Sequence, residues 1–414
     1  MSNKTPQIAV EITICYRPAP VAANWRKVAI LTGQQFDVCI ITTIHGDYDN
    51  RIYQRQLDAL VGDGMKVCMV APWDFSTRRR QDFGYVRLRP AGSRLSRPRH
   101  GLRTMKAALS VDARVYIFHD AEFLPYAAEL KRRSGAVVIY DCHENIPEDI
   151  RHGKDWIPKP LRPPISVSFR MVEETVARYL GRVIVVVPHQ YRRFSRLGIK
   201  VSLVRNLPNF EAPENFEREE AVLYTGSLSR DYGFYLLLEI GREMKRRGIK
   251  VPLRIVDRFY KSEHLRAEMV EAIEKEGLHI EFIKPCRAED MPKLLAKGSI
   301  GISPLLDTPN KALAYPTKVF EYFAYGLVTI ASDIEGTREI LEPGDVGILV
   351  PARDIKAWVD KIEVVLNDQD VAAGYRKRAR DAYLDHFNWA KERKVLVNFV
   401  REALEEAPPR KAIA

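Results

Sequence analysis

Short runs rich in β-branched residues alternate along this chain with longer segments of helical periodicity. The first such unit is a strand at 36–44, a helix at 51–62 and a strand at 66–71. Strands joined through a crossover helix run parallel in one sheet. An open parallel sheet binds its ligands at the carboxyl ends of its strands. The alternation therefore predicts an α/β protein whose functional residues lie in the loops that follow strands.

The alternation occurs in two series, separated by a polar segment at 204–220 that contains Pro208 and Pro213. A chain of 414 residues is too long for one ordinary core, so we expect two domains. We predict an N-terminal extension at 1–35, a Rossmann-like domain at 36–208, a second Rossmann-like domain at 209–385, and a crossing helix with a tail at 386–414.

The composition is that of a globular protein outside the membrane. No apolar run approaches the roughly 20 residues of a membrane span, and the N-terminus lacks the layout of a signal peptide. We therefore expect a cytoplasmic protein. No CxxC pair occurs, which argues against zinc, iron–sulfur or disulfide frameworks. The five cysteines are Cys15, Cys39, Cys68, Cys142 and Cys286.

The net charge of +11 lies mostly in the first half of the chain. Residues 1–200 hold 32 Lys and Arg against 19 Asp and Glu, whereas the remainder holds 33 against 35. Such an excess suits an anionic membrane surface, a lipid-linked diphosphate or an acidic polysaccharide. A solvated basic loop is the alternative. Nucleic acid is disfavoured, because no recognition module accompanies the charge. The densest stretch, 78–106, carries Arg78, Arg79, Arg80, Arg87, Arg89, Arg94, Arg97, Arg99, Arg103 and Lys106 against Asp82.

A candidate phosphate site lies at 315–326, where the sequence reads YPTKVFEYFAYG. Pro316 suits the first turn of a helix, and the free amides at a helix N-terminus favour phosphate. Thr317, Lys318 and Glu321 then share one helix face. A diphosphate at the helix end and a ribose on the carboxylate would fit this face. The alternative is a buried helix with Lys318 and Glu321 paired on its rim.

Polar and ionisable residues also follow the strands of the first series. His45 and Asp49 follow the first strand, His119-Asp120-Ala121-Glu122 follows the strand at 115–118, and Asp141-Cys142-His143-Glu144 follows the strand at 137–140. This layout is typical of a site on an open α/β sheet.

The block from Gly301 through Pro316-Thr317-Lys318 and Glu321 to Ile340 resembles the nucleotide-sugar segment of retaining glycosyltransferases of the GT-B fold, family GT4, also called glycosyl transferases group 1. The resemblance extends over nearly the whole chain and implies two doubly wound Rossmann-like domains facing a central cleft. The further stretches are 42–71, 116–125, 138–144, 204–206, 224–228 and 387–389.

The resemblance implies that the second domain binds the donor. Gly226 and Ser227 would approach the diphosphate, and Glu321 would hold the ribose. Relatives place a basic pair where this chain has Ser227 and Tyr232, so we expect Arg230 and Lys318 as substitutes. The expected donor-binding residues are Gly226, Ser227, Arg230, Pro316, Thr317, Lys318 and Glu321.

The resemblance also implies front-face transfer with retention, in which the protein stabilises the leaving diphosphate and orients the acceptor. The expected catalytic residues are His119, Lys318 and Glu321. His119 would lie nearest the reacting centre, although it could instead be a structural histidine bonded to Asp120 or Glu122. The expected acceptor-binding residues are His45, Asp49, His143 and Glu144.

We expect a hexosyltransferase-type enzyme that moves sugar from a nucleotide-diphosphate sugar to a polysaccharide or lipid-linked acceptor, peripheral on the inner face of the cell membrane. No metal or cofactor is expected, because the DxD at 47–49 is a short motif that follows the first strand. The chain departs from the family at Leu313, where a glutamate is usual, and at Asp257 and Arg258. Without that glutamate, the outer hydroxyls of the sugar are expected to meet Asn310, Lys311 or backbone amides around Pro316. Two alternatives stay open. The GT-B fold also hosts nucleotide-sugar 2-epimerases, and the departures at Leu313 and Ser227 would suit a non-catalytic binding partner.

Overall fold

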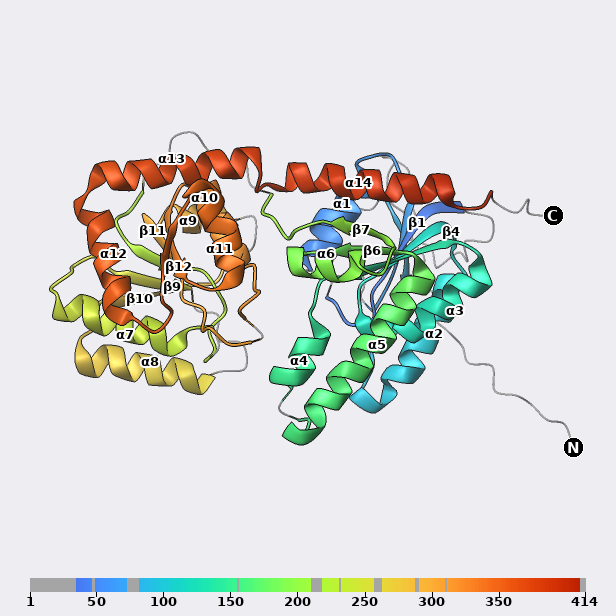
Figure 1. The fold of residues 1–414 in the computed structure, drawn as a ribbon, viewed down its shortest axis with the longest axis horizontal. Coiled ribbons are helices and arrows are strands. Elements are labelled where there is room, and N and C mark those ends of the chain that lie inside the picture. Colours follow the sequence, from blue (N-terminus) through green and yellow to red (C-terminus); the bar gives the residue numbers. More distant parts are fainter. Residues whose placement is uncertain are drawn as a thin grey trace, which may run out of the picture. The chain divides into compact units, whose positions relative to one another are not determined.

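The computed structural model divides the chain into two compact units (Figure 1). The first comprises Met1–Arg205 and Glu392–Ala414, and the second comprises Asn206–Lys391. Both units contain a parallel sheet with helices, which confirms the predicted class of two Rossmann-like domains. The predicted extension at 1–35 lies outside the described residues except for Gln35. The structure describes 35–46, 49–72, 82–154, 156–209, 218–230, 232–256, 263–286, 290–309 and 311–409.

The first domain is built on a seven-stranded parallel sheet of order β3-β2-β1-β4-β5-β6-β7. Ile41 of β1 pairs with Phe118 of β4, which pairs with Tyr140 of β5, so these three strands end near one level. The order reverses direction between β1 and β4, and such a switch point opens a crevice at the carboxyl ends. The strands are β1 Gln35–Ile41, β2 Val67–Ala71, β3 Gly84–Arg87, β4 Asp112–Phe118, β5 Val137–Cys142, β6 Arg182–Val185 and β7 Lys200–Leu203.

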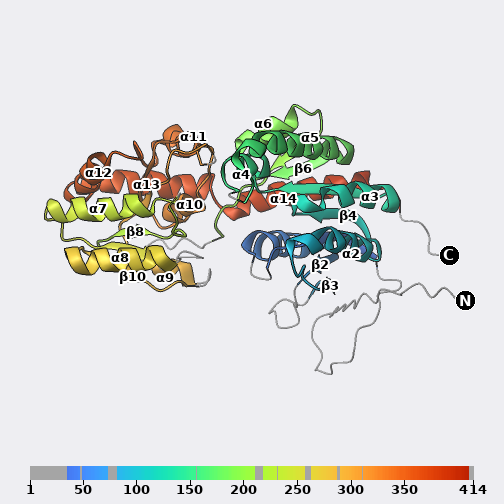
Figure 2. The same cartoon turned by 90° about the horizontal axis from the view of Figure 1, so that it is seen from below.

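Helices cover this sheet, and α2, α3 and α5 pack in sequence beside one another (Figure 1, Figure 2). The helix predicted at 51–62 is a π-helix, Asn50–Leu57, that continues as a short α-helix. The helices of this domain are α1 Asp58–Val61, α2 Arg97–Leu109, α3 Leu124–Ser134, α4 Ile146–His152, α5 Arg162–Leu180, α6 Pro188–Ser195 and α14 Trp389–Glu406, with 3₁₀ turns at Arg94–Ser96, Ala121–Phe123 and Lys159–Leu161.

The basic stretch at 78–106 is in part helical, so the loop interpretation is wrong for α2. This helix buries Thr104 and Met105 against the sheet. Its basic side chains Arg97, Arg99, Arg103 and Lys106 are exposed. The helix therefore presents a positively charged outer face. Arg78, Arg79 and Arg80 lie outside the described residues.

The second domain has a six-stranded parallel sheet of order β10-β9-β8-β11-β12-β13. Its strands are β8 Val222–Tyr224, β9 Leu253–Val256, β10 Ile280–Ile283, β11 Ile300–Ser303, β12 Val328–Ser332 and β13 Ile348–Val350. Its helices are α7 Phe234–Arg246, α8 Glu263–Glu276, α9 Met291–Leu295, α10 Thr317–Ala324, α11 Glu335–Leu341, α12 Ile355–Asn367 and α13 Gln369–Asp385, with a 3₁₀ turn at Glu342–Gly344.

The C-terminal segment forms two helices around Asn388. The Asn388 side-chain amide donates to the Tyr383 carbonyl (2.8 Å), while its oxygen accepts from the Lys391 amide (3.2 Å). Asn388 thus terminates α13 and caps the start of α14. The chain returns to the first domain at Glu392.

A buried ion pair fastens α14 where the chain leaves and re-enters the first domain. Glu392 accepts from the Arg205 amide (2.8 Å) and from its Nε (2.9 Å). The Glu392 side chain is 3% exposed and that of Arg205 is 24% exposed.

No helix among the described residues is long and apolar enough to cross a membrane.

We predict that Glu392→Ala destabilises the first domain by about 3 kcal/mol, because removing one partner leaves a largely buried guanidinium without its counter-charge. Glu405→Ala, an exposed position on the same helix, should change stability by less than about 0.5 kcal/mol. Denaturant unfolding of the full chain measures both. Equal stability losses would show that the pair does not anchor α14.

Candidate functional site

Predicted residues of the first domain converge at the carboxyl ends of three adjacent strands. His45 follows β1, His119 and Asp120 follow β4, and Asp141 and His143 lie at the end of β5. Because these strands are neighbours in the sheet, residues almost 100 positions apart lie in contact. We call these five residues the histidine cluster.

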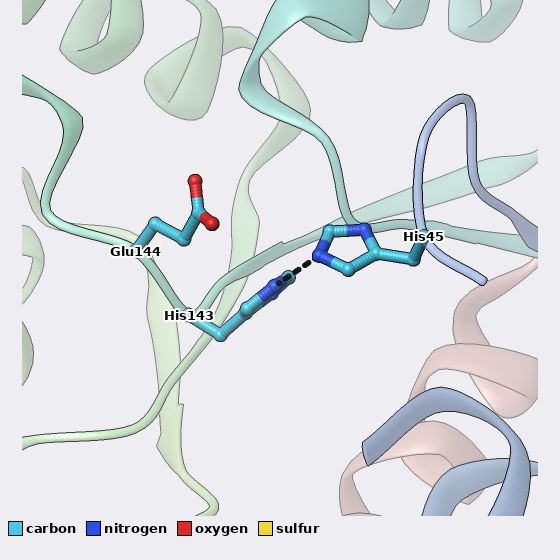
Figure 3. A group of neighbouring side chains, drawn as sticks. All are labelled: His45, His143 and Glu144. Carbon is cyan, nitrogen blue, oxygen red and sulfur yellow. Dashed lines mark hydrogen bonds between the residues drawn. The ribbon is translucent and has the colours of Figure 1, made fainter. Parts of the chain in front are cut away.

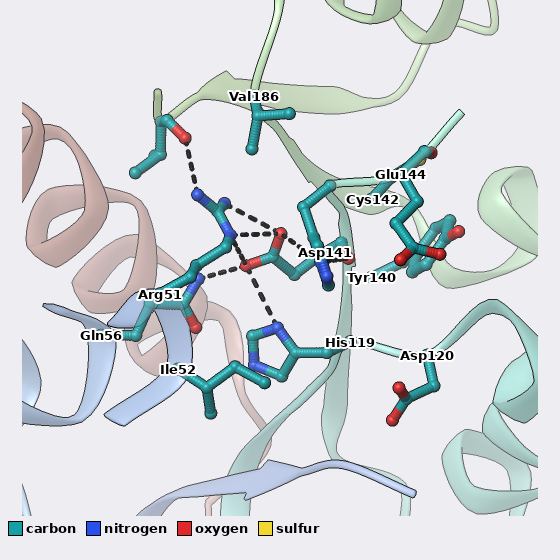
Figure 4. Close-up of polar contacts among 12 residues, drawn as sticks. Arg51, Ile52, Gln56, His119, Asp120, Tyr140, Asp141, Cys142, Glu144 and Val186 are labelled. Atoms are coloured by element: carbon teal, nitrogen blue, oxygen red, sulfur yellow. Dashed lines mark hydrogen bonds and ion pairs between the residues drawn. The ribbon is translucent and has the colours of Figure 1, made fainter. Parts of the chain in front are cut away.

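Asp141 is the hub of the histidine cluster (Figure 4). Arg51 Nε lies 3.1 Å from each carboxylate oxygen of Asp141, and Gln56 also donates to this carboxylate. The side chains of Arg51 and Asp141 are 5% and 0% exposed. Burial alone would raise the pKa of Asp141, but Arg51 and His143 hold it well below its usual range. The carboxylate is therefore ionised and ties the π-helix to β5.

His119 is fully enclosed beside this hub. Its Nδ1 lies 3.5 Å from Asp141 Oδ2, and neither ring nitrogen makes a hydrogen bond to the described residues. Burial lowers the pKa of His119 to about 4, against the opposing effect of Asp141. The ring is therefore neutral at pH 7. The carboxylate nearest to His119 is that of Asp141. The alternative pairing with Asp120 or Glu122 is wrong, because Asp120 pairs with His45 and Glu122 pairs with Arg97.

Asp120 belongs instead to His45. His45 Nδ1 lies 2.8 Å from Asp120 Oδ1, and Thr42 Oγ1 donates to Asp120 Oδ2 (3.0 Å). Burial alone would raise the pKa of Asp120 and lower that of His45, but their mutual attraction reverses both directions. In the sequence, only the strand-end positions of both residues indicate this pairing.

His45 and His143 point at one another (Figure 3). Their Nε2 atoms are 3.2 Å apart, and the ring centroids are 4.9 Å apart. His143 Nδ1 lies 3.3 Å from the Asp141 carbonyl oxygen. One ligand atom from each of His45, His143 and Glu144 falls within 4.8 Å of the others, and a second such group comprises His119, Asp141 and His143. The structure therefore brings together three of the four residues predicted to bind acceptor.

Asp49, the fourth of these, caps the π-helix. Its Oδ1 accepts from the amides of Arg51 and Ile52, both at 2.9 Å. The carboxylate thus orients the helix that supplies Arg51 to the hub. Asp47 and Tyr48, the other members of the DxD motif, lie outside the described residues.

In the second domain, Lys318 lies against the turn that follows β8. A side chain at Gly226 would place its Cβ 2.2 Å from Lys318 Nζ and 2.6 Å from Tyr224 Oη. Lys318 Nζ also lies 4.0 Å from the centroid of the Tyr224 ring. The absence of a side chain at 226 therefore gives the ammonium group room to reach the turn.

The helix that carries Lys318 is locked to the sheet by Tyr322. The Tyr322 hydroxyl accepts from the Thr225 amide (3.2 Å) and lies 3.2 Å from the Ile302 carbonyl. A Cβ at Gly301 would lie 2.4 Å from the Tyr322 ring, so glycine is needed there as well. The helix begins at Thr317 after Pro316, and no side chain caps its N-terminus. Its first amides and Lys318 therefore provide positive potential beside the turn.

Lys318 is 8% exposed. This burial lowers the pKa of its ammonium group to about 7; the charge of Glu321 opposes the shift, and the charge of Lys311 adds to it. Near neutral pH the free lysine is thus about half charged. A neighbouring anion would favour the charged form of Lys318.

From the sequence, Lys311 is expected to contact the sugar, but the structure places it beside Tyr232. Lys311 Nζ lies 3.0 Å from Tyr232 Oη and 4.2 Å from the centroid of that ring. It thus brings a positive charge to Tyr232, one of the positions where relatives have a basic residue. Arg230, the substitute predicted from the sequence, is exposed.

The remaining predicted donor residues surround the same helix end. Glu321 is half-buried one turn after Thr317, and Ser227 is half-buried in the turn after β8. Leu313 lies in a loop that packs on α11, where the Gly336 amide donates to the Ala312 carbonyl (2.8 Å). Asn310, Asp257 and Arg258 lie outside the described residues.

The second domain matches a known family. Residues 208–382 match the model of the family described as Glycosyl transferases group 1. This match, together with the structural neighbours below, confirms the predicted resemblance to glycosyltransferases of the GT-B fold.

Solved structures of the same two-domain fold cover almost the whole chain. Sucrose-phosphate synthase from Thermosynechococcus elongatus has a TM-score of 0.70 at 18% identity, covering 90% of this chain and 100% of that one. HepE from Anabaena, solved with UDP and glucose, has a TM-score of 0.67 at 14% identity, covering 89% and 100%. These similarities establish the GT-B fold.

One curated relative matches over a shorter stretch. An exopolysaccharide phosphotransferase from Streptomyces coelicolor is 31% identical over 108 residues, which are 25% of this chain and 11% of that protein. The chain therefore spans about a tenth of the length of this relative.

We predict that Lys318 titrates with a midpoint near pH 7, because its ammonium group is buried. NMR of protein labelled at the lysine Cε carbons should show one resonance with this midpoint, far below the ordinary value of about 10.5. The resonance should vanish in Lys318→Arg and persist in Lys356→Arg, which changes an exposed lysine of the same domain. Ordinary titration of all lysines would contradict the prediction.

Proposed function

We propose that this chain is a retaining glycosyltransferase of the GT4 type, which transfers a hexose from a nucleotide-diphosphate sugar. The proposal proceeds from the group 1 match of the second domain and from the GT-B fold of the whole. The observation that carries it is the buried Lys318, held against the Gly226 turn at the uncapped start of α10. Glycine, cation and helix N-terminus together form a phosphate site.

In this proposal the nucleotide lies across the helix end of the second domain. Its diphosphate accepts from the first amides of α10 and pairs with Lys318, and Glu321 accepts from the ribose hydroxyls. Lys311, beside Tyr232, adds a second positive charge in place of Arg230. UDP and glucose in the HepE structure support a nucleotide sugar as the donor class.

Stabilisation of the departing diphosphate is the main chemical task assigned to these groups. Charge grows on the leaving oxygen as the glycosidic bond breaks, and buried cations act strongly where water is excluded. With retention, the leaving diphosphate takes the proton of the acceptor hydroxyl on the same face. Lysines perform the charge neutralisation, so no divalent ion is needed at the diphosphate.

The proposed acceptor is a polysaccharide or a lipid-linked oligosaccharide bound by the first domain. His45, His143 and Glu144 are the proposed contacts, because they lie together at the strand ends and are not fully buried. His119 is enclosed and neutral, so we assign it a place beneath the acceptor. The stretch shared with an exopolysaccharide phosphotransferase supports polysaccharide as the acceptor class.

The test is calorimetric titration of the full chain with UDP, GDP, ADP and TDP in the presence of EDTA. We predict that one nucleotide binds, and that Glu321→Ala and Lys318→Met each weaken it about 10- to 100-fold, as expected for loss of a hydrogen-bonded or charged contact of about 1.5–3 kcal/mol. Lys311→Met should weaken it less, because Lys311 is more exposed.

Glu342→Ala serves as the matched control, because Glu342 is an exposed carboxylate of the same domain. Its nucleotide affinity should equal that of the wild type. Absence of binding by all four nucleotides would contradict the donor site and favour a non-catalytic partner protein. Turnover of donor to its 2-epimer without acceptor would favour an epimerase.

We further propose that the first domain associates with an anionic membrane surface. The segment from α4 to α5 exposes large apolar side chains, and an open apolar hollow of about 650 Å³ lies between residues 121–125 and 161–172. The exposed basic side chains lie on α2, which packs against α3, and α3 in turn packs against α5. Exposed apolar and basic groups in one domain suit an anionic lipid interface. The exposed apolar residues are Trp156, Leu161, Ile165, Val167, Met171 and Val172.

Co-sedimentation with vesicles tests this surface. The full chain should bind phosphatidylglycerol vesicles and not phosphatidylcholine vesicles, with weaker binding as salt rises. Replacing both Arg99 and Arg103 with alanine should weaken binding roughly 30-fold, at about 1 kcal/mol for each charge. The matched double variant Lys250→Ala, Lys275→Ala in the second domain should bind normally. Absence of binding at low ionic strength would contradict the proposal.

A further inference from the structure

The histidine cluster has a geometric feature that acceptor binding does not require. His45 and His143 direct their Nε2 atoms at each other across 3.2 Å, as Figure 3 shows. The opposite nitrogen of each ring already faces an oxygen: Asp120 Oδ1 at 2.8 Å for His45, and the Asp141 carbonyl at 3.3 Å for His143. The two Nε2 atoms are therefore the nitrogens that face one another.

A carbonyl oxygen and an ionised carboxylate only accept hydrogen bonds, so the neutral tautomer that serves both oxygens carries its proton on Nδ1 of each ring. Both Nε2 atoms then present lone pairs to one another. Two facing lone pairs repel, and they are stabilised only when a positive species lies between them. That species is either a shared proton or a metal ion.

The separation fits a metal ion. Zinc–nitrogen distances of about 2.0–2.1 Å place two imidazole ligands of a tetrahedral ion about 3.3 Å apart. The observed 3.2 Å is close to this value. Glu144 supplies a third ligand atom within 4.8 Å of the other two. The Glu144 side chain is exposed, and Figure 3 shows its carboxylate beside the two histidine rings. A rotation of this side chain can bring the carboxylate closer to the two Nε2 atoms.

The groups that accept hydrogen bonds from the other nitrogen of each histidine are of the kind found around metal sites. A ligating histidine commonly donates its other N–H to a carboxylate or a backbone carbonyl, which fixes the ring and strengthens its donor nitrogen. Here Asp120 serves His45, and Asp120 is itself held by Thr42 and Thr43. The rings are thus oriented before any ion arrives.

We propose that His45, His143 and Glu144 form a binding site for a zinc-class divalent ion in the first domain. Two imidazoles and one carboxylate suit zinc or its neighbours rather than magnesium or calcium, which prefer oxygen ligands. Three protein ligands leave one position for water or a substrate oxygen. The inference departs from the metal-free expectation, which rested on cysteine spacing and on residues 47–49. It does not depend on the proposed function.

The test is calorimetric titration of untagged, metal-stripped full chain with Zn²⁺, without nucleotide. We expect one ion per chain, and loss of this binding in both His45→Ala and His143→Ala. Asp120→Asn should weaken binding about 10- to 100-fold, because it removes the group that orients His45 without removing a ligand. Ion binding that is unaffected by the two histidine variants would overturn the proposal.

His279→Ala is the matched control. His279 Nε2 lies 3.7 Å from Glu281, so it forms a histidine–carboxylate pair in the second domain without the geometry of the cluster. Its Zn²⁺ affinity should equal that of the wild type.

A measurement on the unmodified chain covers the case in which a histidine variant fails to fold. Zinc-edge X-ray absorption should show two imidazole ligands and no sulfur, which also distinguishes this site from adventitious binding at the half-buried thiol of Cys286. A sulfur-ligated spectrum, or the absence of bound zinc, would show that the histidine pair shares a proton only.

Discussion

The second domain is organised around a buried cation. Lys318 lies where a side chain at Gly226 would occupy its place, and Tyr322 of the same helix is fastened to β8 and β11. A buried ammonium group without a full counter-charge is unfavourable, and its lowered pKa expresses this cost. The cost is removed when an anion binds. The fold therefore holds Lys318 in a state that favours a phosphate-bearing ligand.

In the first domain, by contrast, the buried charge of Asp141 has partners within the protein. The Asp141 carboxylate receives Arg51 and Gln56 and remains ionised without any ligand. It is thus a structural hub, whereas neither ring nitrogen of His119 beside it makes a hydrogen bond to the described residues. Asp141 therefore holds the cluster together, whereas the residues proposed to meet a substrate or an ion are His45, His143 and Glu144.

Much of this arrangement could be predicted from the sequence, because strands with β-branched residues and the helix at 317–324 obey simple periodicities. The long helix α5 was missed because it buries Ser166, Glu173, Ala177 and Leu180 while Val167, Met171 and Val172 face solvent. Its apolar pattern therefore indicates no buried face. The pairing of Asp120 with His45 was also missed, since adjacency along the chain favoured His119. Lys311 approaches Tyr232 from a loop, and no local pattern predicts such a contact.

Proton uptake on nucleotide binding tests the central claim most directly. Calorimetry at pH 8 in buffers of different ionisation enthalpy gives the number of protons bound together with the nucleotide diphosphate. A free lysine with a pKa near 7 that becomes fully charged in the complex takes up about 0.9 proton. We predict this uptake for the wild type and its loss in Lys318→Arg. Equal proton uptake by both proteins, or none by either, would contradict the role of Lys318 as the buried cation that meets the diphosphate.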